Sequence, residues 1–297
     1  MLFKKYADLY IYLNSDDWKP SYLDKQKGII KNYLTHFYNQ DINTIKSTDI
    51  KIYFKTIELI GNKSKRNILT VLNGIFKLAI EDEAIDKNPL IHFGRLKYKA
   101  PKIQPFSADE VNQMIEKSKN YNFNFVYFLA MGFYTGMRTG EILSLKLDEV
   151  DLKNKTISIN STRSRFGESS PKTDGSIRRI PIINSLYPYI KKMKLKNLKL
   201  IDNEYMLVNQ YKKPYRDTFV FTQRWWKPLL EELNLEYRRP YNMRHTFATN
   251  MLYKKVCTPV ELAQFLGHTT TEMIYNVYVN FLEGHLDKFD KSIDIYF

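Results

Sequence analysis

The sequence predicts a mainly α-helical protein with two domains, of which the second also contains a small antiparallel sheet. Apolar residues recur at spacings of three and four along most of the 297 residues, which is typical of amphipathic helices. Two short segments after residue 150 have the character of β-strands. A basic segment with two prolines, near residues 98–106, has neither pattern and divides a chain whose length suits about two domains.

The first domain, residues 1–97, is expected to be a small bundle of about four helices. The segments with helical periodicity are residues 4–13, 22–37, 49–60 and 65–85. The third stops at Gly61, and the Asn88-Pro89 pair ends the fourth because proline disfavours helical geometry in the residue before it. Residues 98–106 then form an extended linker.

The second domain, residues 107–297, is expected to be a mixture of helices and strands. Ser107 and Glu110 have the spacing of a capping box, so a helix starts there. The expected helices are residues 111–117, 125–134, 187–196, 218–233, 243–254, 259–265 and 270–279. Pro228 is expected to kink or split the helix at 218–233.

The small sheet is expected to pair residues 156–160 with residues 178–182. The first segment alternates in the manner of a strand, and the second is interpreted as its antiparallel partner. Pro181 indicates the edge of the sheet, since proline cannot donate a ladder hydrogen bond. A turn is expected at residues 172–175.

The charge of the chain indicates a polyanionic partner. The formal net charge is +14, with 46 lysines and arginines against 32 acidic residues. Residues 1–100 carry 17 basic and 11 acidic residues, so both domains share the basic character. Such an excess favours nucleic acid as the partner.

Composition also argues against several classes of protein. Cys257 is the single cysteine, which excludes a disulfide within the chain and a cysteine-based zinc site. No apolar run reaches the roughly 18 residues that a membrane helix needs. The first residues lack the features of a signal peptide, so we expect a cytoplasmic protein without a membrane partner.

Three short motifs carry residues suited to phosphate chemistry. Arg138 lies between two glycines, with Glu141 three residues on; Arg244 lies in a run that begins at Tyr241; and His268 follows Leu266-Gly267, ten residues before Tyr278. Two guanidinium groups can hold one phosphate, and a phenol can attack it. In their order and spacing, these motifs resemble those of the tyrosine recombinases, or phage integrases.

The resemblance covers most of residues 107–281 and extends by architecture to residues 1–97, which are similar to the family's SAM-like core-DNA-binding domain. It implies a tyrosine-recombinase-like catalytic domain and a site-specific recombinase or integrase that acts through a 3′-phosphotyrosyl intermediate, in a phage or other mobile element. It implies neither metal nor other cofactor. It also implies a homotetramer on double-stranded DNA with specific recombination sites, assembled through the C-terminal tail at 282–297. A tail that instead forms a helix packed on its own chain is an open alternative.

The resemblance also assigns roles to individual residues. Arg138 and Arg244 would hold the scissile phosphate, His268 would hydrogen-bond to it, and Tyr278 would be the nucleophile. Lys172 would protonate the leaving 5′ oxygen. Tyr275, seven residues after His268, is the competing nucleophile because on a helix it shares a face with Tyr278.

Three neighbouring residues receive supporting roles. Tyr241 stands where the family usually has histidine, so either a catalytic contact to the phosphate or simple packing against the helix is open. His245 is expected to be a structural hydrogen-bonding residue. Glu141 matches the acidic residue of the family's first arginine motif, and an ion pair with Arg138 that only holds the turn is an open alternative.

The expected DNA contacts are Lys63, Lys65, Arg66, Arg178 and Arg179. Four other functions remain open at this point. Two use the same chemistry, namely a chromosome-dimer resolvase of the Xer type and a type IB topoisomerase-like enzyme that relaxes DNA. The third is a catalytically silent DNA-binding accessory protein, and the fourth is a metal-dependent nuclease.

Overall fold

A computed structural model describes residues 1–99, 103–170, 174–272, 274 and 275. The chain divides into two compact units, Met1–Pro101 and Lys102–Phe297. The first unit is helical, whereas the second combines helices with two small antiparallel sheets. The predicted fold class, mainly α with a small sheet in the second unit, is therefore confirmed.

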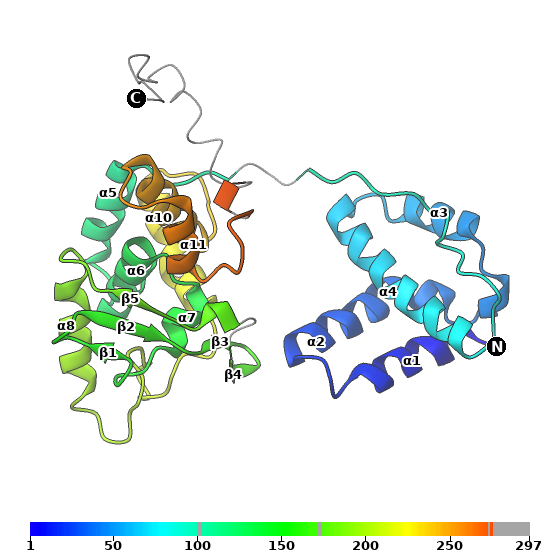
Figure 1. Cartoon of the computed structure of the whole chain (residues 1–297), viewed down its shortest axis with the longest axis horizontal. Helices are drawn as coiled ribbons and strands as arrows, with labels where there is room; N and C mark the ends of the chain where they lie inside the picture. The colour runs from blue at the N-terminus through cyan, green and yellow to red at the C-terminus, as the bar shows by residue number, and fades with distance from the viewer. Residues whose placement is uncertain (100–102, 171–173, 273, 276–297) are drawn as a thin grey trace, which may run out of the picture. The chain divides into compact units, whose positions relative to one another are not determined.

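The first unit is a helical bundle built around aromatic residues (Figure 1). Its helices are α1 (Phe3–Asn14), α2 (Pro20–Ile29), α3 (Ser47–Thr56) and α4 (Asn62–Glu81), with short helical turns η1 (Ile30–Leu34), η2 (Thr35–Phe37) and η3 (Ile42–Thr44). The Phe3 ring packs at 5.7 Å from Phe37 and 6.0 Å from Phe76. These contacts join α1, η2 and α4 in one core, as amphipathic helices require.

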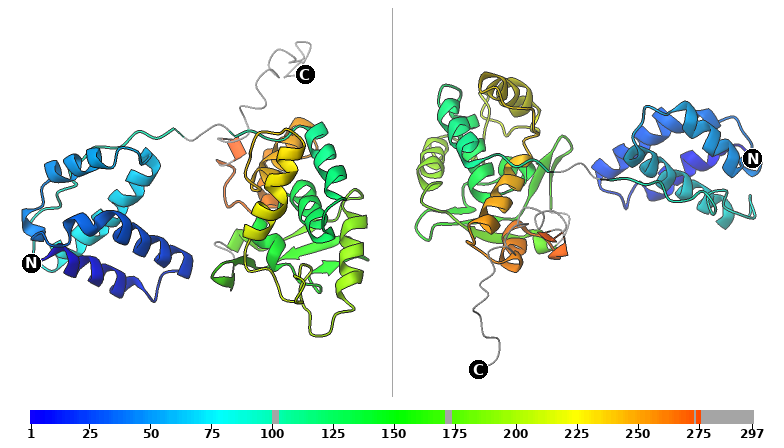
Figure 2. Two further views of the ribbon diagram at one scale, coloured as in Figure 1. Left: turned by 180° about the vertical axis from the view of Figure 1, so that it is seen from behind. Right: turned by 90° about the horizontal axis from the view of Figure 1, so that it is seen from above.

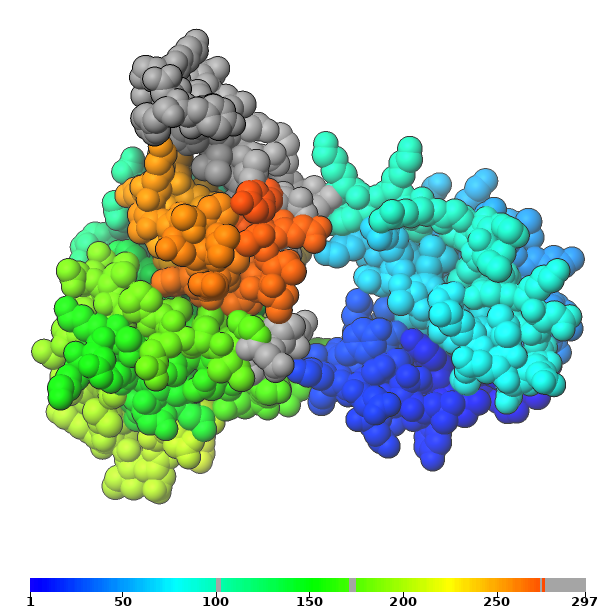
Figure 3. Space-filling model, in the orientation of Figure 1, coloured from blue at the N-terminus to red at the C-terminus, as the bar shows by residue number. Residues whose placement is uncertain are grey.

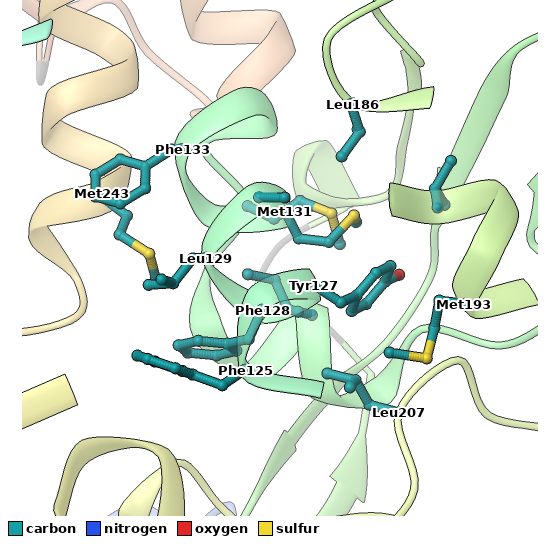
Figure 4. Packing of buried hydrophobic residues seen from close by; sticks show 14 of the residues in the cluster. Phe125, Tyr127, Phe128, Leu129, Met131, Phe133, Leu186, Met193, Leu207 and Met243 are labelled. Carbon is teal, nitrogen blue, oxygen red and sulfur yellow. The ribbon is translucent and has the colours of Figure 1, made fainter. Parts of the chain in front are cut away.

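The second unit is organised around α6, which is apolar on nearly all sides. Its helices are α5 (Ala108–Ser118), α6 (Phe123–Thr135), α7 (Thr139–Ser144), α8 (Tyr187–Asn197), α9 (Lys227–Glu232), α10 (Asn242–Tyr253) and α11 (Pro259–Leu266). Figure 4 shows side chains of α6 pointing in different directions, with Met243 near Phe133 and Met193 near Tyr127. A helix that is apolar on all sides is expected at the centre of a core. Because this packing holds α6 in place, it also fixes the position of the residues that directly follow the helix.

The main sheet has the strand order β1-β2-β5, made of Val150–Asp151, Thr156–Ile159 and Arg178–Pro181. Strands β2 and β5 are antiparallel, and Pro181 is opposite Thr156 on the edge strand, as predicted. The left view of Figure 2 shows the green strands of this sheet with the yellow-green helix α8 beside them. A second hairpin, β3 (Thr162–Ser164) with β4 (Gly167–Ser169), precedes the helical turn η4 (Asp174–Ser176) and was not predicted.

The helical segment that precedes residue 233 changes from π-helical to α-helical next to Pro228, and it continues without a break. The π-helical turn η5 (Phe221–Trp226) comes first, and α9 starts at Lys227 with Pro228 in its first turn. The Lys227 amide donates to the Thr222 carbonyl, a bond that spans one residue more than in an α-helix. Proline has no amide hydrogen and fits the first turn of a helix, so the change of helix type at this point has a local cause.

Candidate active site

Arg138 occupies a tight connection between two helices. Gly136 ends α6 in the left-handed conformation, with φ of 61°, and α7 begins at Thr139. The Arg138 amide donates to Glu141 Oε2 at 2.9 Å, and its Nη1 donates to Glu141 Oε1 at 2.7 Å. The ion pair considered from the sequence is therefore present, while the Arg138 side chain keeps 34% of its surface exposed.

Arg244 lies in the first turn of α10 and is almost fully buried, with 1% of its surface exposed. Its guanidinium binds main-chain oxygens from two distant segments. Nη1 donates to the carbonyl of Gly136 at 2.9 Å, and Nη2 donates to that of Leu266 at 2.8 Å. The Arg244 guanidinium is thus held at the carbonyl of Gly136, which comes two residues before Arg138 in the chain.

The turn at residues 266–268, directly after α11, brings the predicted residues together. Arg138 Nη2 donates to the carbonyl of Gly267 at 3.3 Å, next to the Leu266 carbonyl that Arg244 binds. The His268 Nε2 atom lies 2.7 Å from Arg244 Nη2. Two arginines and a histidine, separated by up to 130 positions in the sequence, therefore meet at one turn.

The site carries more positive than negative charge. Burial, together with Arg138 and Arg178, lowers the pKa of Arg244 to about 10, so this side chain is still a cation at neutral pH. Burial and the neighbouring arginines lower the pKa of His268 to about 4, so the imidazole is neutral. Because Arg244 donates to Nε2, a neutral His268 carries its proton on Nδ1. Cationic arginines beside a neutral histidine form a site that is suited to binding an anion.

Arg178 does not lie on the surface where we expected a DNA contact. Its side chain is only 6% exposed, and both of its terminal nitrogens bind Glu141, at 2.9 Å and 3.2 Å. Burial alone would raise the pKa of Glu141, but Arg178 and then Arg138 hold it below its usual range. The alternation of side chains along a strand could have predicted that Arg178 is buried, since Arg178 shares a face of β5 with the buried Ile180.

Tyr241 and His245 lie side by side at the start of α10. Tyr241 is 39% exposed and directly precedes the helix, and its ring is 5.1 Å from the His245 ring at an angle of 75°. Burial, followed by the charge of Arg244, lowers the pKa of His245 to about 4. His245 is therefore neutral. The contact between the two rings is consistent with the interpretation that Tyr241 packs against the helix.

The other expected DNA contacts divide into exposed and buried side chains. Lys63, Arg66 and Arg179 are exposed. Lys65 is a correction, because its side chain is buried and its ammonium donates to the Phe54 carbonyl at 3.0 Å. It lies on the apolar stripe of α4 that includes Ile68, which is why its charge faces inward.

Lys63 and Arg66 line a groove within the first unit. The groove has a volume of about 420 Å³, and Arg95 and Tyr98 are also part of its wall. The Lys63 ammonium lies 5.8 Å from the centre of the Tyr98 ring. Three cations around a shallow surface with an aromatic side chain suit a phosphate backbone or a stacked ring.

Two predicted residues, Lys172 and Tyr278, lie outside the described residues, as does the tail at 282–297. Tyr275 is described and is 50% exposed. Among the described residues, no group of three or more histidine, cysteine or acidic side chains is arranged to hold a metal ion. Within the same ranges, no helix has the length and apolar character needed to span a bilayer.

Comparisons with known proteins show the family to which the chain belongs. Residues 104–285 match the model of the phage integrase family. The ICEBs1 integrase of Bacillus subtilis is 27% identical, over 94% of this chain and 81% of its own length. A protein described as tyrosine recombinase XerC-like, from Caldanaerobacter subterraneus subsp. tengcongensis, is 26% identical over 88% of this chain and 74% of its own.

The fold is also shared with solved structures. The Tn1549 transposon integrase, in complex with a circular intermediate DNA, superimposes with a TM-score of 0.77. It is 19% identical, and the match covers 95% of this chain and 98% of the other. The architecture is therefore kept at a low level of sequence identity.

Proposed function

The chain belongs to the phage integrase family of tyrosine recombinases, and on this premise we propose that Arg138, Arg244 and His268 bind the DNA phosphate that Tyr278 attacks. The protein is a site-specific DNA recombinase, of the kind found in integrative elements, transposons and phages. The first unit is proposed to bind the DNA core site through contacts that include Lys63 and Arg66, and Arg179 is proposed as a DNA contact of the second unit.

One observation carries the assignment of the site. The guanidiniums of Arg138 and Arg244 bind the successive carbonyls of Gly267 and Leu266, and His268 follows directly. Guanidinium is planar and permanently charged, so it can contact two phosphate oxygens at once. Removing one such preorganised donor typically costs about 2.7–4 kcal/mol of transition-state stabilisation.

The proposed reaction is a transesterification at phosphorus. The Tyr278 oxygen bonds to phosphorus as the phenol proton leaves, and the bond to the 5′ oxygen breaks. Lys172 protonates that oxygen, which makes it a better leaving group. A 5′ hydroxyl of the partner strand then attacks the 3′-phosphotyrosine and releases the tyrosine, so each bond broken is replaced by one formed.

A nicked suicide DNA substrate tests this proposal. After cleavage, the short fragment that carries the freed 5′ hydroxyl diffuses away and cannot reverse the reaction. The covalent protein–DNA adduct therefore accumulates and is measured by gel electrophoresis. We expect an adduct with the wild-type protein and with Tyr275→Phe, and none with Tyr278→Phe. An adduct that persists in Tyr278→Phe would refute the nucleophile, and one lost in the presence of a chelator would indicate a metal-dependent reaction.

A chromosome-dimer resolvase of the Xer type is the second candidate, because a XerC-like protein is among the relatives. The chemistry is the same, and only the DNA sites differ. Recombination between the two ends of a circularised element would support the integrase, whereas recombination confined to a chromosomal resolution site would support the resolvase.

Assembly and location follow from the same proposal. A homotetramer on two DNA sites, joined through the tail at 282–297, is what the family resemblance implies. We further propose that the protein works in the cytoplasm, where the DNA of such an element is found. Sedimentation of the protein with and without a synthetic four-way junction tests the tetramer.

A further inference from the structure

Among the described residues, Arg178 donates four side-chain hydrogen bonds within the site. Its Nε donates to the Phe265 carbonyl at 2.7 Å, and Nη1 donates to the Ser176 carbonyl at 3.0 Å. Both terminal nitrogens also bind the two oxygens of Glu141. One side chain thereby joins β5, the C-terminal end of α11 and the acid beside Arg138. In Figure 3 the orange atoms of the α11 region lie next to green atoms of the same unit.

The charges around Glu141 explain what this contact does. Glu141 is 2% exposed and is shared by Arg138 and Arg178. With Arg178 alone as its partner the carboxylate would already be neutralised, because the pair is bidentate. The positive charge of Arg138, which is the more exposed of the two, is then left for an anion outside the protein.

We propose that Arg178 is a positioning residue for catalysis, which neutralises Glu141 so that Arg138 can bind the DNA phosphate. Without Arg178, the carboxylate of Glu141 would compete with the phosphate for the Arg138 guanidinium. The proposal rests on the function proposed above and adds to it a role for a residue that does not touch the DNA. It also replaces the surface contact that we expected from the sequence.

The packing around Arg178 supports a fixed position. A Cβ added to Gly267 would lie 3.0 Å from Arg178 Nη1 and 3.2 Å from both Arg178 Cδ and the Gly175 carbonyl. The glycine therefore permits the side chain to pass directly against the turn that carries His268. A side chain held by three acceptors and a close backbone has little freedom to leave Glu141.

A double-mutant cycle tests the proposal. Arg178→Met removes the charge and keeps an unbranched apolar stem, and Glu141→Gln removes the competing carboxylate. Single-turnover adduct formation is measured for each variant and for the pair, with DNA affinity and thermal unfolding recorded alongside. Arg216→Lys is the control, because that side chain is 76% exposed and outside the site.

We expect Arg178→Met to slow adduct formation by about tenfold or more, since it weakens one preorganised donor. Adding Glu141→Gln is expected to restore much of the rate. On a methylphosphonate substrate, which is neutral at the scissile position, the defect of Arg178→Met is expected to shrink. A merely structural residue would give neither result, because a damaged fold is not repaired by a second buried change or by a neutral substrate.

The inference and the proposed function can fail separately. If wild-type protein forms an adduct and Arg178→Met forms it equally fast, the role of Arg178 is refuted and the recombinase stands. A double variant as slow as Arg178→Met also refutes that role. If the wild type forms no adduct at all, the proposed function is refuted first. Should Arg178→Met fail to fold, Arg178→Gln, which removes the charge but keeps a polar end group, takes its place in the same cycle.

Discussion

Replacing Gly267 with alanine is expected to destabilise the second unit and to slow DNA cleavage. Gly267 has φ of 70°, a left-handed conformation that costs a residue with a Cβ about 1–2 kcal/mol. The new Cβ would also crowd Arg178 and the Gly175 carbonyl, at 3.0–3.2 Å. Crowding of this kind adds about 1–3 kcal/mol, so the free energy of unfolding is expected to fall by about 2–5 kcal/mol in all.

Gly167→Ala is the matched control within the same unit. Its φ is 99°, but a Cβ there meets no atom within 4 Å, so only backbone strain of about 1–3 kcal/mol applies. Urea unfolding followed by tryptophan fluorescence gives the stabilities, and the suicide substrate gives the cleavage rates. We expect Gly267→Ala to cleave about tenfold more slowly than Gly167→Ala, since a misplacement of 1 Å can cost about 10²-fold. Equal rates in the two variants would refute the reasoning.

The charges in the molecule lead to three more expectations. Glu141→Gln is expected to lower the free energy of unfolding by about 3–5 kcal/mol, because a buried ion pair loses one member; an unchanged urea midpoint would contradict this. Stability is expected to fall as the pH drops from about 6.5 to about 4, since the pKa values of His245 and His268 are lowered to about 4 in the folded protein and the unfolded chain binds protons first. Urea midpoints across that range measure it, and a midpoint independent of pH would count against neutral histidines. DNA affinity is expected to fall by about 10³-fold or more between about 50 and 200 mM salt if at least about six phosphates are bound, as fluorescence anisotropy would show; a flat response would argue against phosphate contacts.

Helix positions and the motif residues could be predicted because local chemistry determines them. The capping box at Ser107 and the glycine at 267 mark helix ends through bonds within a few residues. The convergence of Arg138 and Arg244 has no such local cause. It depends on tertiary packing, and the sequence indicated it only through the resemblance of its motifs to a known family.

The side on which a basic residue lies was harder to predict than its presence. Lys65 and Arg178 were both expected at the surface, and both are directed inward. In each case the position shares the buried face of its helix or strand, but charge was given more weight than periodicity. The hairpin at residues 162–169 was missed because its strands are short and contain little apolar alternation.

The acceptors that hold the two arginines proposed to bind the phosphate are mostly peptide oxygens. Arg244 binds the carbonyls of Gly136 and Leu266, and Arg138 binds that of Gly267. Every amino acid supplies the same oxygen, so the anchoring survives replacement of the side chain at 266 as long as the local path of the chain persists. Divergent sequences can therefore preserve such an attachment while nearly everything around it is exchanged.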